Sequence, residues 1–310
     1  MNRREFTKTL GGAAFALGLP AFSNASPATP PKFAITMDDF RWRDAVHLPS
    51  EKRNQAILEV LSANRIRAAL FVVAGNVDND PGKALLQTWS TAGHLIGNHT
   101  YSHRSLNSQT AEDYEQDILK AELILKDFKT FQKIFRYPVL KEGNTAAKRD
   151  QVRAFLRQHG YRIGHVTIDN SDWIIDQRLT AKLRKDPNAD IKPYRDFYLE
   201  HMWDRAQYYD SLARRVLGRP VKHTILTHYN LVSALFLGDL IAMLKSKGWQ
   251  LIDAEQAFTD SVFRAEPKIL PAGESIVWAL AKETGKIDKS LRYPAEDGDY
   301  ETARMDKFGL

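Results

Sequence analysis

The chain has 310 residues, of which 43% are hydrophobic and 26% charged, with 44 Lys and Arg against 38 Asp and Glu. This length and composition suit a globular protein of one large domain or two small ones, and they exclude disordered and fibrous classes. The sequence contains no cysteine and nine histidines. A disulfide scaffold, a thiolate zinc site and a cysteine nucleophile are therefore excluded, and any metal ion must bind His, Asp or Glu.

Residues 1–25 have the pattern of an export signal. Arg3 and Arg4 stand before an apolar stretch at 10–22, and small residues at 23–25 suit a cleavage site. The paired arginines resemble a twin-arginine signal, with a general secretory signal as the alternative. Either signal predicts a periplasmic or secreted protein. The apolar stretch is too short and too rich in glycine to span a membrane stably, so we expect no membrane insertion after the signal is removed.

Without this leader the chain carries 41 basic and 37 acidic residues, a net charge of +4. The charges are interspersed, and no run of Lys and Arg reaches five residues. Nucleic-acid binding requires a basic face with groove-reading or aromatic elements, and nothing in the sequence selects for it. We therefore expect no nucleic-acid partner.

The rest of the chain alternates predicted strands with predicted helices. Short apolar runs predict seven buried strands, at Phe33–Met37, Ala68–Val73, His94–Gly97, Lys133–Tyr137, Arg162–Ile168, His223–Leu226 and Trp249–Ile252. Helical periodicity predicts helices at 50–64, 81–91, 110–128, 145–159, 195–217 and 236–247, the third preceded by a capping motif at Thr110–Asp113.

This alternation predicts an α/β protein with a parallel sheet. Seven units fit a distorted (β/α)7 barrel better than an open doubly wound sheet. The long connection from Trp173 to Val221 predicts a helical insertion between the fifth and sixth strands. We expect one barrel domain over residues 26–263, followed at 264–310 by a helix and a mobile tail without chemistry of its own.

Titratable side chains follow five of the predicted strands. They are Asp38 and Asp39, His99 and His103, Arg136, Asp172, and His228. In a β/α barrel the carboxyl ends of the strands meet on the face that carries the active site. An Asp with two His at His-x-x-x-His spacing forms a facial site for zinc or another divalent ion, which lowers the pKa of bound water and polarises a carbonyl. A second carboxylate beside it suits a base, and a His on another strand suits an acid.

These residues carry a family resemblance. Thr36–Phe40, His99–His103, Arg136–Pro138, Asp169–Trp173 and Leu226–His228 resemble, in order, the five motifs of the polysaccharide deacetylases of carbohydrate esterase family 4, which share the NodB-homology barrel. The resemblance spans about residues 32–258. It implies a metal-dependent enzyme that removes N- or O-acetyl groups from carbohydrates.

The resemblance also implies a role for each motif residue. The metal ligands would be Asp39, His99 and His103, with Zn²⁺ as the expected ion and Co²⁺, Ni²⁺ or Mn²⁺ as alternatives. The catalytic set would be Asp38 as general base, Arg136 orienting it, His228 as general acid and Asp172 holding that histidine. Trp173 and Leu226 would wall the acetyl pocket, and a backbone N–H near Val139 would meet the oxyanion. Tyr101, Trp42 and Tyr137 are further candidate substrate contacts.

Two departures from the family motifs concern loops that border the substrate groove. Phe40 stands where the first motif usually ends in Gly, and Val139-Leu140 replaces an aromatic residue followed by Gly. Because Gly permits backbone geometry that other residues resist, we expect these loops to differ from the common form.

The expected function is an exported metal-dependent deacetylase acting on N-acetylated amino sugars of a glycan such as peptidoglycan, a chitin-like polymer or an exopolysaccharide. Two alternatives remain open. One is an O-acetyl esterase acting on a xylan-like polymer, and the other is a glycan-binding protein whose catalysis has decayed.

Overall fold

The computed structural model describes residues 29–285, 291–292 and 299–310. The proposed export signal at 1–25 lies outside the described residues. In the described part of the chain, no helix combines the length and apolar character that crossing a membrane requires.

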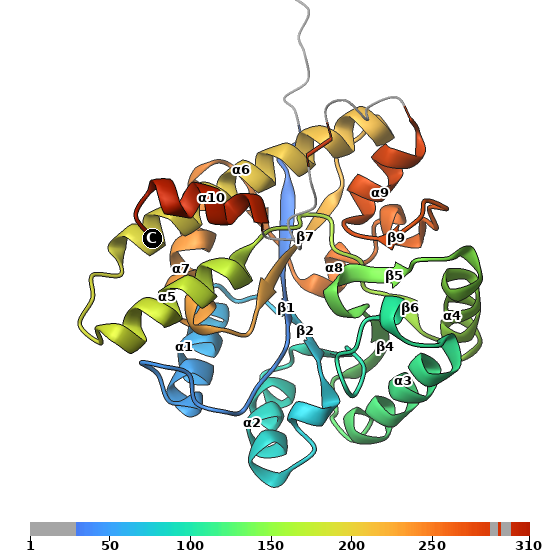
Figure 1. Ribbon diagram of the computed structural model, residues 1–310, viewed down its shortest axis with the longest axis horizontal. Helices are drawn as coiled ribbons and strands as arrows, with labels where there is room; N and C mark the ends of the chain where they lie inside the picture. Colours follow the sequence, from blue (N-terminus) through green and yellow to red (C-terminus); the bar gives the residue numbers. More distant parts are fainter. Residues whose placement is uncertain (1–28, 286–290, 293–298) are drawn as a thin grey trace, which may run out of the picture.

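One sheet of seven parallel strands organises the molecule, in the order β6-β4-β3-β2-β1-β7, with β8 also paired to β1 (Figure 1). Its strands are β1 (Lys32–Asp38), β2 (Ala69–Val72), β3 (Leu95–Asn98), β4 (Phe131–Phe135), β6 (Arg162–Ile163), β7 (Lys222–His228) and β8 (Gln250–Leu251). A separate antiparallel pair joins β5 (Lys141–Gly143) to β9 (Ala272–Gly273). All seven predicted strands are therefore present in the parallel sheet.

The sheet curls into a half-barrel. The predicted strand Arg162–Ile168 is divided: β6 pairs with β4, whereas Ile168 pairs with Ile225 of β7 through an isolated bridge. The segment after β6 thus brings the two ends of the sheet together. The predicted α/β barrel class is confirmed in this curled, incompletely closed form.

Helices cover the outside of the sheet (Figure 1). They are α1 (Ser50–Ala63), α2 (Asp80–Thr91), α3 (Ala111–Leu125), α4 (Ala146–Gln158), α5 (Asp172–Lys185), α6 (Lys192–Leu217), α7 (Leu231–Ser246), α8 (Ala254–Ala257), α9 (Ile276–Glu283) and α10 (Asp299–Lys307). The predicted cap of α3 is confirmed, because Thr110 Oγ1 accepts a hydrogen bond from the N–H of Asp113 at 3.1 Å. The long connection between β6 and β7 holds two helices, α5 and α6, where the sequence predicted one.

The core lies on both faces of β1, whose residues from Phe33 to Met37 are all fully buried. Burial on both faces explains why this strand is a continuous apolar run rather than an alternating one. The C-terminal segment joins the same core: Ile276, Val277 and Trp278 of α9 and Met305 of α10 are buried in it. The tail expected to be mobile thus includes a helix, α10, packed beside α5 and α6 (Figure 1).

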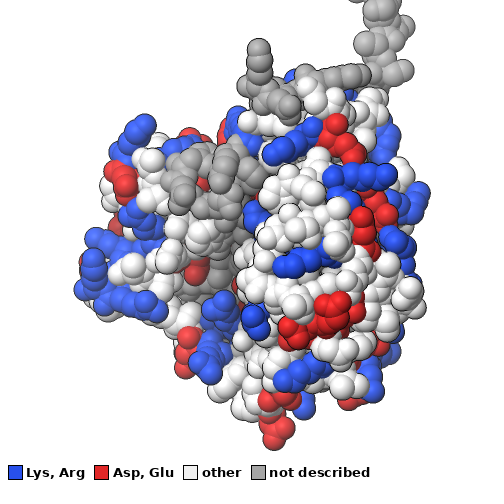
Figure 2. All heavy atoms as spheres, turned by 45° about the vertical axis from the view of Figure 1, so that its right-hand side comes forward, with Lys and Arg blue, Asp and Glu red and all other residues white. Residues whose placement is uncertain are grey.

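Charged side chains are distributed over the surface, with Lys and Arg interspersed among smaller groups of Asp and Glu on the face shown in Figure 2. This distribution agrees with the small net charge of the chain.

Candidate active site

The candidate site lies at the carboxyl ends of the parallel strands. Asp38 is the last residue of β1 and lies opposite His228, the last residue of β7, in the strand register. Asp39 follows directly, and His99 and Arg136 come immediately after β3 and β4. Parallel pairing therefore brings together groups that are distant in the sequence.

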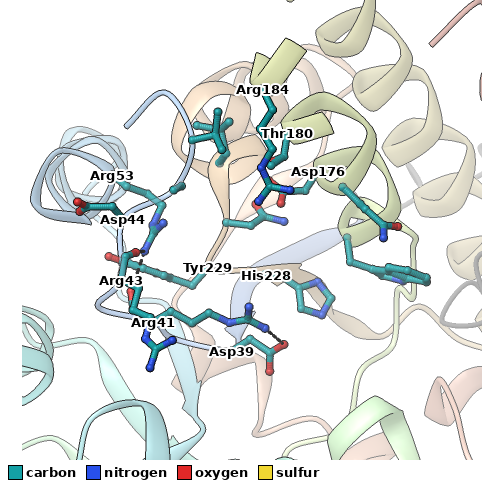
Figure 3. A pocket seen from close by; sticks show the side chains of 16 residues that line it. Asp39, Arg41, Arg43, Asp44, Arg53, Asp176, Thr180, Arg184, His228 and Tyr229 are labelled. Carbon is teal, nitrogen blue, oxygen red and sulfur yellow. Dashed lines mark hydrogen bonds and ion pairs between the residues drawn. The ribbon is translucent and has the colours of Figure 1, made fainter. Parts of the chain in front are cut away.

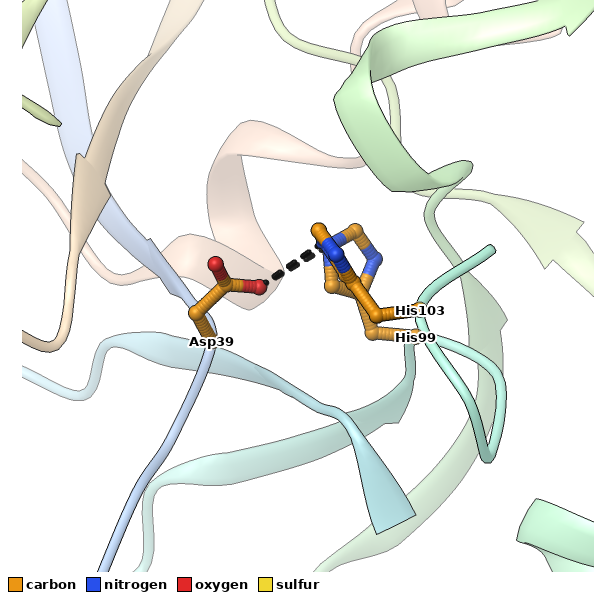
Figure 4. Close-up of side chains that lie close together, drawn as sticks. All are labelled: Asp39, His99 and His103. Carbon is orange, nitrogen blue, oxygen red and sulfur yellow. Dashed lines mark ion pairs between the residues drawn. The ribbon is translucent and has the colours of Figure 1, made fainter. Parts of the chain in front are cut away.

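The side chains of Asp39, His99 and His103 form a compact cluster (Figure 4). Asp39 Oδ1 lies 3.0 Å from Nε2 of His103 and 3.6 Å from Nε2 of His99. His99 Nδ1 donates a hydrogen bond to the carbonyl of Arg136 at 2.8 Å, which fixes the tautomer and leaves its Nε2 lone pair directed at the cluster. One ligand atom from each residue lies within 4.8 Å of the others.

Electrostatics keep this cluster in the form that binds a cation. Burial works to raise the pKa of Asp39, but its hydrogen bond to His103 and the nearby His228 and His99 hold that pKa well below its usual range. Burial lowers the pKa of His99 to about 4, so its imidazole is neutral at physiological pH. One carboxylate and two imidazoles fit zinc or a similar divalent ion.

Asp38 is held by a buried arginine. Arg136 Nη1 lies 2.6 Å from Asp38 Oδ1, and both side chains are almost fully buried. Arg136 Nη1 also donates to Thr36 Oγ1 at 3.0 Å, and its Nε donates to the carbonyl of Gly164 at 2.8 Å. These bonds fix the guanidinium, so the orientation of the Asp38 carboxylate is set in advance. The sequence did not predict this role for Thr36. The available signal was that Thr36 is the one hydroxyl side chain in the otherwise apolar run Phe33–Met37.

His228 is held by Asp172, which is fully buried at the start of α5. His228 Nδ1 donates to Asp172 Oδ1 at 2.6 Å, while the backbone N–H of His228 donates to Oδ2 at 2.8 Å. The His228 side chain, which carries the other ring nitrogen Nε2, lines a cavity beside Asp39 (Figure 3). Asn170 Oδ1 in turn accepts the N–H of Asp172 at 3.0 Å and steadies the loop.

A fully buried histidine, His201, supports this loop. His201 of α6 accepts the backbone N–H of Ser171 at Nε2, at 3.0 Å, and its Nδ1 lies 3.3 Å from Glu301 Oε2. Glu301 belongs to α10, in the tail whose sequence showed no chemistry. His201 and Glu301 lie 100 positions apart in the sequence, and no local pattern links them. Their contact could therefore not be predicted from spacing.

The proposed substrate contacts differ in whether they line the cavity or are buried in the core. Trp173 lines the cavity that contains His228. Tyr137 is buried against Tyr114 and Phe135, and Leu226 is fully buried. These two side chains belong to the core beneath the site.

The remaining candidates lie on the rim. Trp42 lines two hollows beside α2 but does not line the cavity that contains His228. Tyr101 donates its hydroxyl hydrogen bond to Asp78 at 3.2 Å, and the ammonium group of Lys120 lies 3.5 Å from the centre of its ring. Val139 is 40% exposed, with its side chain on the surface of the loop after β4.

Backbone strain is concentrated around this site. Five non-glycine residues of the site loops have positive φ: Asp39 (63°), Thr100 (63°), His103 (60°), Val139 (48°) and Leu140 (52°). Leu140 stands where the family motif has Gly, and both it and Val139 adopt the backbone region that Gly favours. Residues in this region cost about 1–2 kcal/mol each and persist where the surroundings hold them in place.

Known proteins resemble this chain over part of its length. Residues 25–164 match the model of the polysaccharide deacetylase family. A peptidoglycan-N-acetylglucosamine deacetylase of Bacillus cereus is 26% identical over 153 residues, which cover 49% of this chain and 50% of the relative. A chitooligosaccharide deacetylase of Rhizobium leguminosarum bv. trifolii is 37% identical over 62 residues, 20% of this chain and 28% of the relative. This chain thus spans half or less of the length of these relatives.

Solved structures give the fold. A mutant of BA3943 from Bacillus anthracis, a CE4 family pseudoenzyme whose enzymatic activity was restored, has a TM-score of 0.52 and 16% identity, over 74% of this chain and 68% of that one. The curled parallel sheet is therefore the fold of the CE4 deacetylase structures. The family model and the relatives thus show that this chain is similar to the polysaccharide deacetylases over part of its length.

Proposed function

We propose that the chain is a metal-dependent deacetylase that hydrolyses N-acetyl groups of amino sugars in a glycan. The observation that carries this proposal is that the Asp39–His99–His103 cluster lies beside two groups that are held in different ways, Asp38 by Arg136 and His228 by Asp172. The relatives named above, which act on peptidoglycan and chitin-type sugars, support the same chemistry.

A divalent ion held by Asp39, His99 and His103 would polarise the acetyl carbonyl and make water acidic enough to be deprotonated near neutral pH. Asp38, oriented by Arg136, accepts the proton from the attacking water. His228 donates a proton to the nitrogen that leaves, and Asp172 keeps its Nδ1–H in place so that the proton to be donated is on Nε2. The backbone N–H in the strained turn at Val139 is the proposed donor to the developing oxyanion.

The substrate experiment is a comparison of acetate release from chitin oligomers, peptidoglycan and acetylated xylan. We expect release from one of the first two, abolished when the metal is removed with a chelator and restored by Zn²⁺, with Co²⁺, Ni²⁺ and Mn²⁺ tested in parallel. Release from acetylated xylan alone would replace the amide substrate with an O-acetyl ester. Tight glycan binding with no release from any polymer would instead identify a binding protein without catalysis.

We also propose that the protein is exported, through the twin-arginine signal at its N-terminus. Changing Arg3 and Arg4 together to Lys preserves the charge but removes the paired arginines. We expect the full chain to accumulate inside the cell in this variant, as measured by fractionation of the periplasm. Unchanged export would favour the general secretory signal.

A further inference from the structure

The loop after β1 departs from the family motif at Phe40 and continues with Arg41-Trp42-Arg43. Phe40 is fully buried, with its ring centre 4.5 Å from that of Tyr229 and 6.4 Å from that of Trp89. Tyr229 follows His228 directly. The base of the loop is therefore packed against the strand end that carries the proposed acid.

A buried arginine holds the rest of the loop. Arg53 of α1 donates from Nη2 to the carbonyls of Arg41 and Arg43, both at 2.8 Å, and its guanidinium lies 5.0 Å from the ring centre of Tyr229. Arg53 is only 4% exposed, and its Nε has no hydrogen-bond partner among the described residues. A buried N–H group without an acceptor is costly unless water or a ligand accepts its hydrogen bond.

Arg53 borders a cavity of about 570 Å³ that opens beside Asp39 and His228 (Figure 3). This volume lies within the usual range for small-ligand sites. The loop supplies Arg41 and Arg43 to one wall of the cavity, and Thr180 and Arg184 of α5 border it as well. Trp173, whose indole N–H has no partner in the described part of the chain, adds an aromatic wall.

The arginines of this cavity differ in what they already bind. Arg41 lies 3.6 Å from Asp39. Arg43 and Arg184 are exposed, and neither guanidinium has an ion pair or hydrogen bond within the residues that the structure describes. Both are therefore available to a ligand.

The acidic groups of the cavity are largely committed elsewhere. Asp39 belongs to the metal cluster, Asp44 Oδ1 accepts the N–H of Ser50 at 2.7 Å, and Asp176 Oδ1 accepts the N–H of Val232 at 3.0 Å. Burial raises the pKa of Asp176. The cavity wall away from the metal cluster thus presents more positive than negative charge.

We propose that this cavity is a subsite for an anionic group on the glycan, a carboxylate or a phosphate carried by a sugar near the one that is deacetylated, and that Arg43 and Arg184 bind it. The planar guanidinium fork matches either oxyanion. Because Arg53 fixes the loop, Arg43 is presented with little loss of conformational entropy on binding. This inference rests on the proposed deacetylase function and adds the charge of its substrate.

The test compares three oligosaccharides of equal length with the zinc-loaded full chain. They are a neutral chitin oligomer, a peptide-free peptidoglycan oligomer with free lactyl carboxylates, and a chitin oligomer phosphorylated at a sugar hydroxyl. We expect one anionic oligomer to have a KM about tenfold below that of the neutral one. The double variant Arg43→Gln/Arg184→Gln should remove this advantage with kcat unchanged, because charge-assisted contacts made before reaction contribute to binding. The oligomer that the variant affects identifies the source of the anion.

The matched control is Lys182→Gln/Lys185→Gln, which removes two positive charges from exposed positions of the same helix, α5, outside the cavity. We expect it to leave the preference intact. The proposal is overturned if the wild type does not distinguish anionic from neutral oligomers, or if both double variants change KM equally. Normal release from the neutral oligomer in either case shows that the deacetylase function stands without the subsite, whereas no release from any oligomer would overturn both.

Discussion

Histidines at the two ends of the parallel sheet have different surroundings. At the carboxyl ends, His99, His103 and His228 each use one ring nitrogen for the site, and positive φ angles are concentrated in the surrounding loops. Near the amino ends, His94 and His223 are enclosed. His94 Nδ1 accepts the N–H of Ala68 at 3.1 Å, and His223 lies within hydrogen-bond distance of Thr167 and Asp210.

This difference agrees with the proposed reaction at the carboxyl ends and with a packing role for the histidines at the amino ends. Burial lowers the pKa of His94 to about 4, so its imidazole is a neutral packing group, and burial also lowers the pKa of His223. Changes at the carboxyl ends should therefore reduce activity more than stability, and changes at the amino ends should do the reverse. Variants of Asp38, Asp172 and His94 test that separation, and variants of the turn after β4 distinguish strain from packing at the carboxyl ends.

The largest effect is expected for Asp38→Asn. An amide cannot accept the proton of water, so we expect the rate of acetate release to fall about a thousandfold. Zinc content, measured on the purified variant, should stay the same because the ligand cluster is intact. A variant that keeps activity within tenfold of the wild type would show that Asp38 is not the base.

Asp172→Asn should have the next largest effect. The variant keeps the size of the side chain but removes the charge that holds Nδ1–H of His228, so we expect kcat to fall about a hundredfold. The measurement is the pH profile of kcat, in which the limb assigned to the acid should move to lower pH because the imidazolium loses its stabilising carboxylate. An unchanged profile would indicate that Asp172 has only a structural role.

How far the sequence predicts these features depends on whether a contact is local. The apolar runs locate all seven parallel strands, and the cap at Thr110 is visible in four residues. The sequence did not resolve α5, although Ile175, Leu179 and Leu183 have helical spacing and are buried on one face. The contact of Glu301 with His201 depends on how α10 docks, which no short pattern encodes.

At the amino ends, acid should reduce stability through His94. Its pKa is near 6.5 in an unfolded chain and about 4 in the fold, so between these values the unfolded chain binds more protons. The free energy of unfolding should therefore fall as the pH falls, by about 2 kcal/mol between pH 7.5 and pH 5 from this residue. Urea unfolding at both pH values measures the change.

The matched variant is His94→Gln, whose amide oxygen still accepts the N–H of Ala68. We expect a smaller loss of stability on acidification, with acetate release at pH 7.5 unchanged. The pH dependence should not vanish, because burial also lowers the pKa of His165 and His223. A variant with the same pH dependence as the wild type would contradict a neutral role for His94.

The smallest effect separates strain from packing within the turn after β4. Val139 (φ 48°) and Leu140 (φ 52°) have similar backbone conformations, but Val139 is 40% exposed, whereas Leu140 is buried against Val166 and Leu226. Val139→Gly removes the steric cost of a branched side chain at positive φ and loses little burial, so we expect a gain of about 1 kcal/mol in the free energy of unfolding. Leu140→Gly relieves similar strain but leaves a cavity, so we expect a net loss of about 2 kcal/mol. Urea unfolding of both variants gives the two signs. If Val139→Gly instead lowers stability, the turn is held by contacts of the valine side chain, and the conformation at this edge of the site is not a strained one.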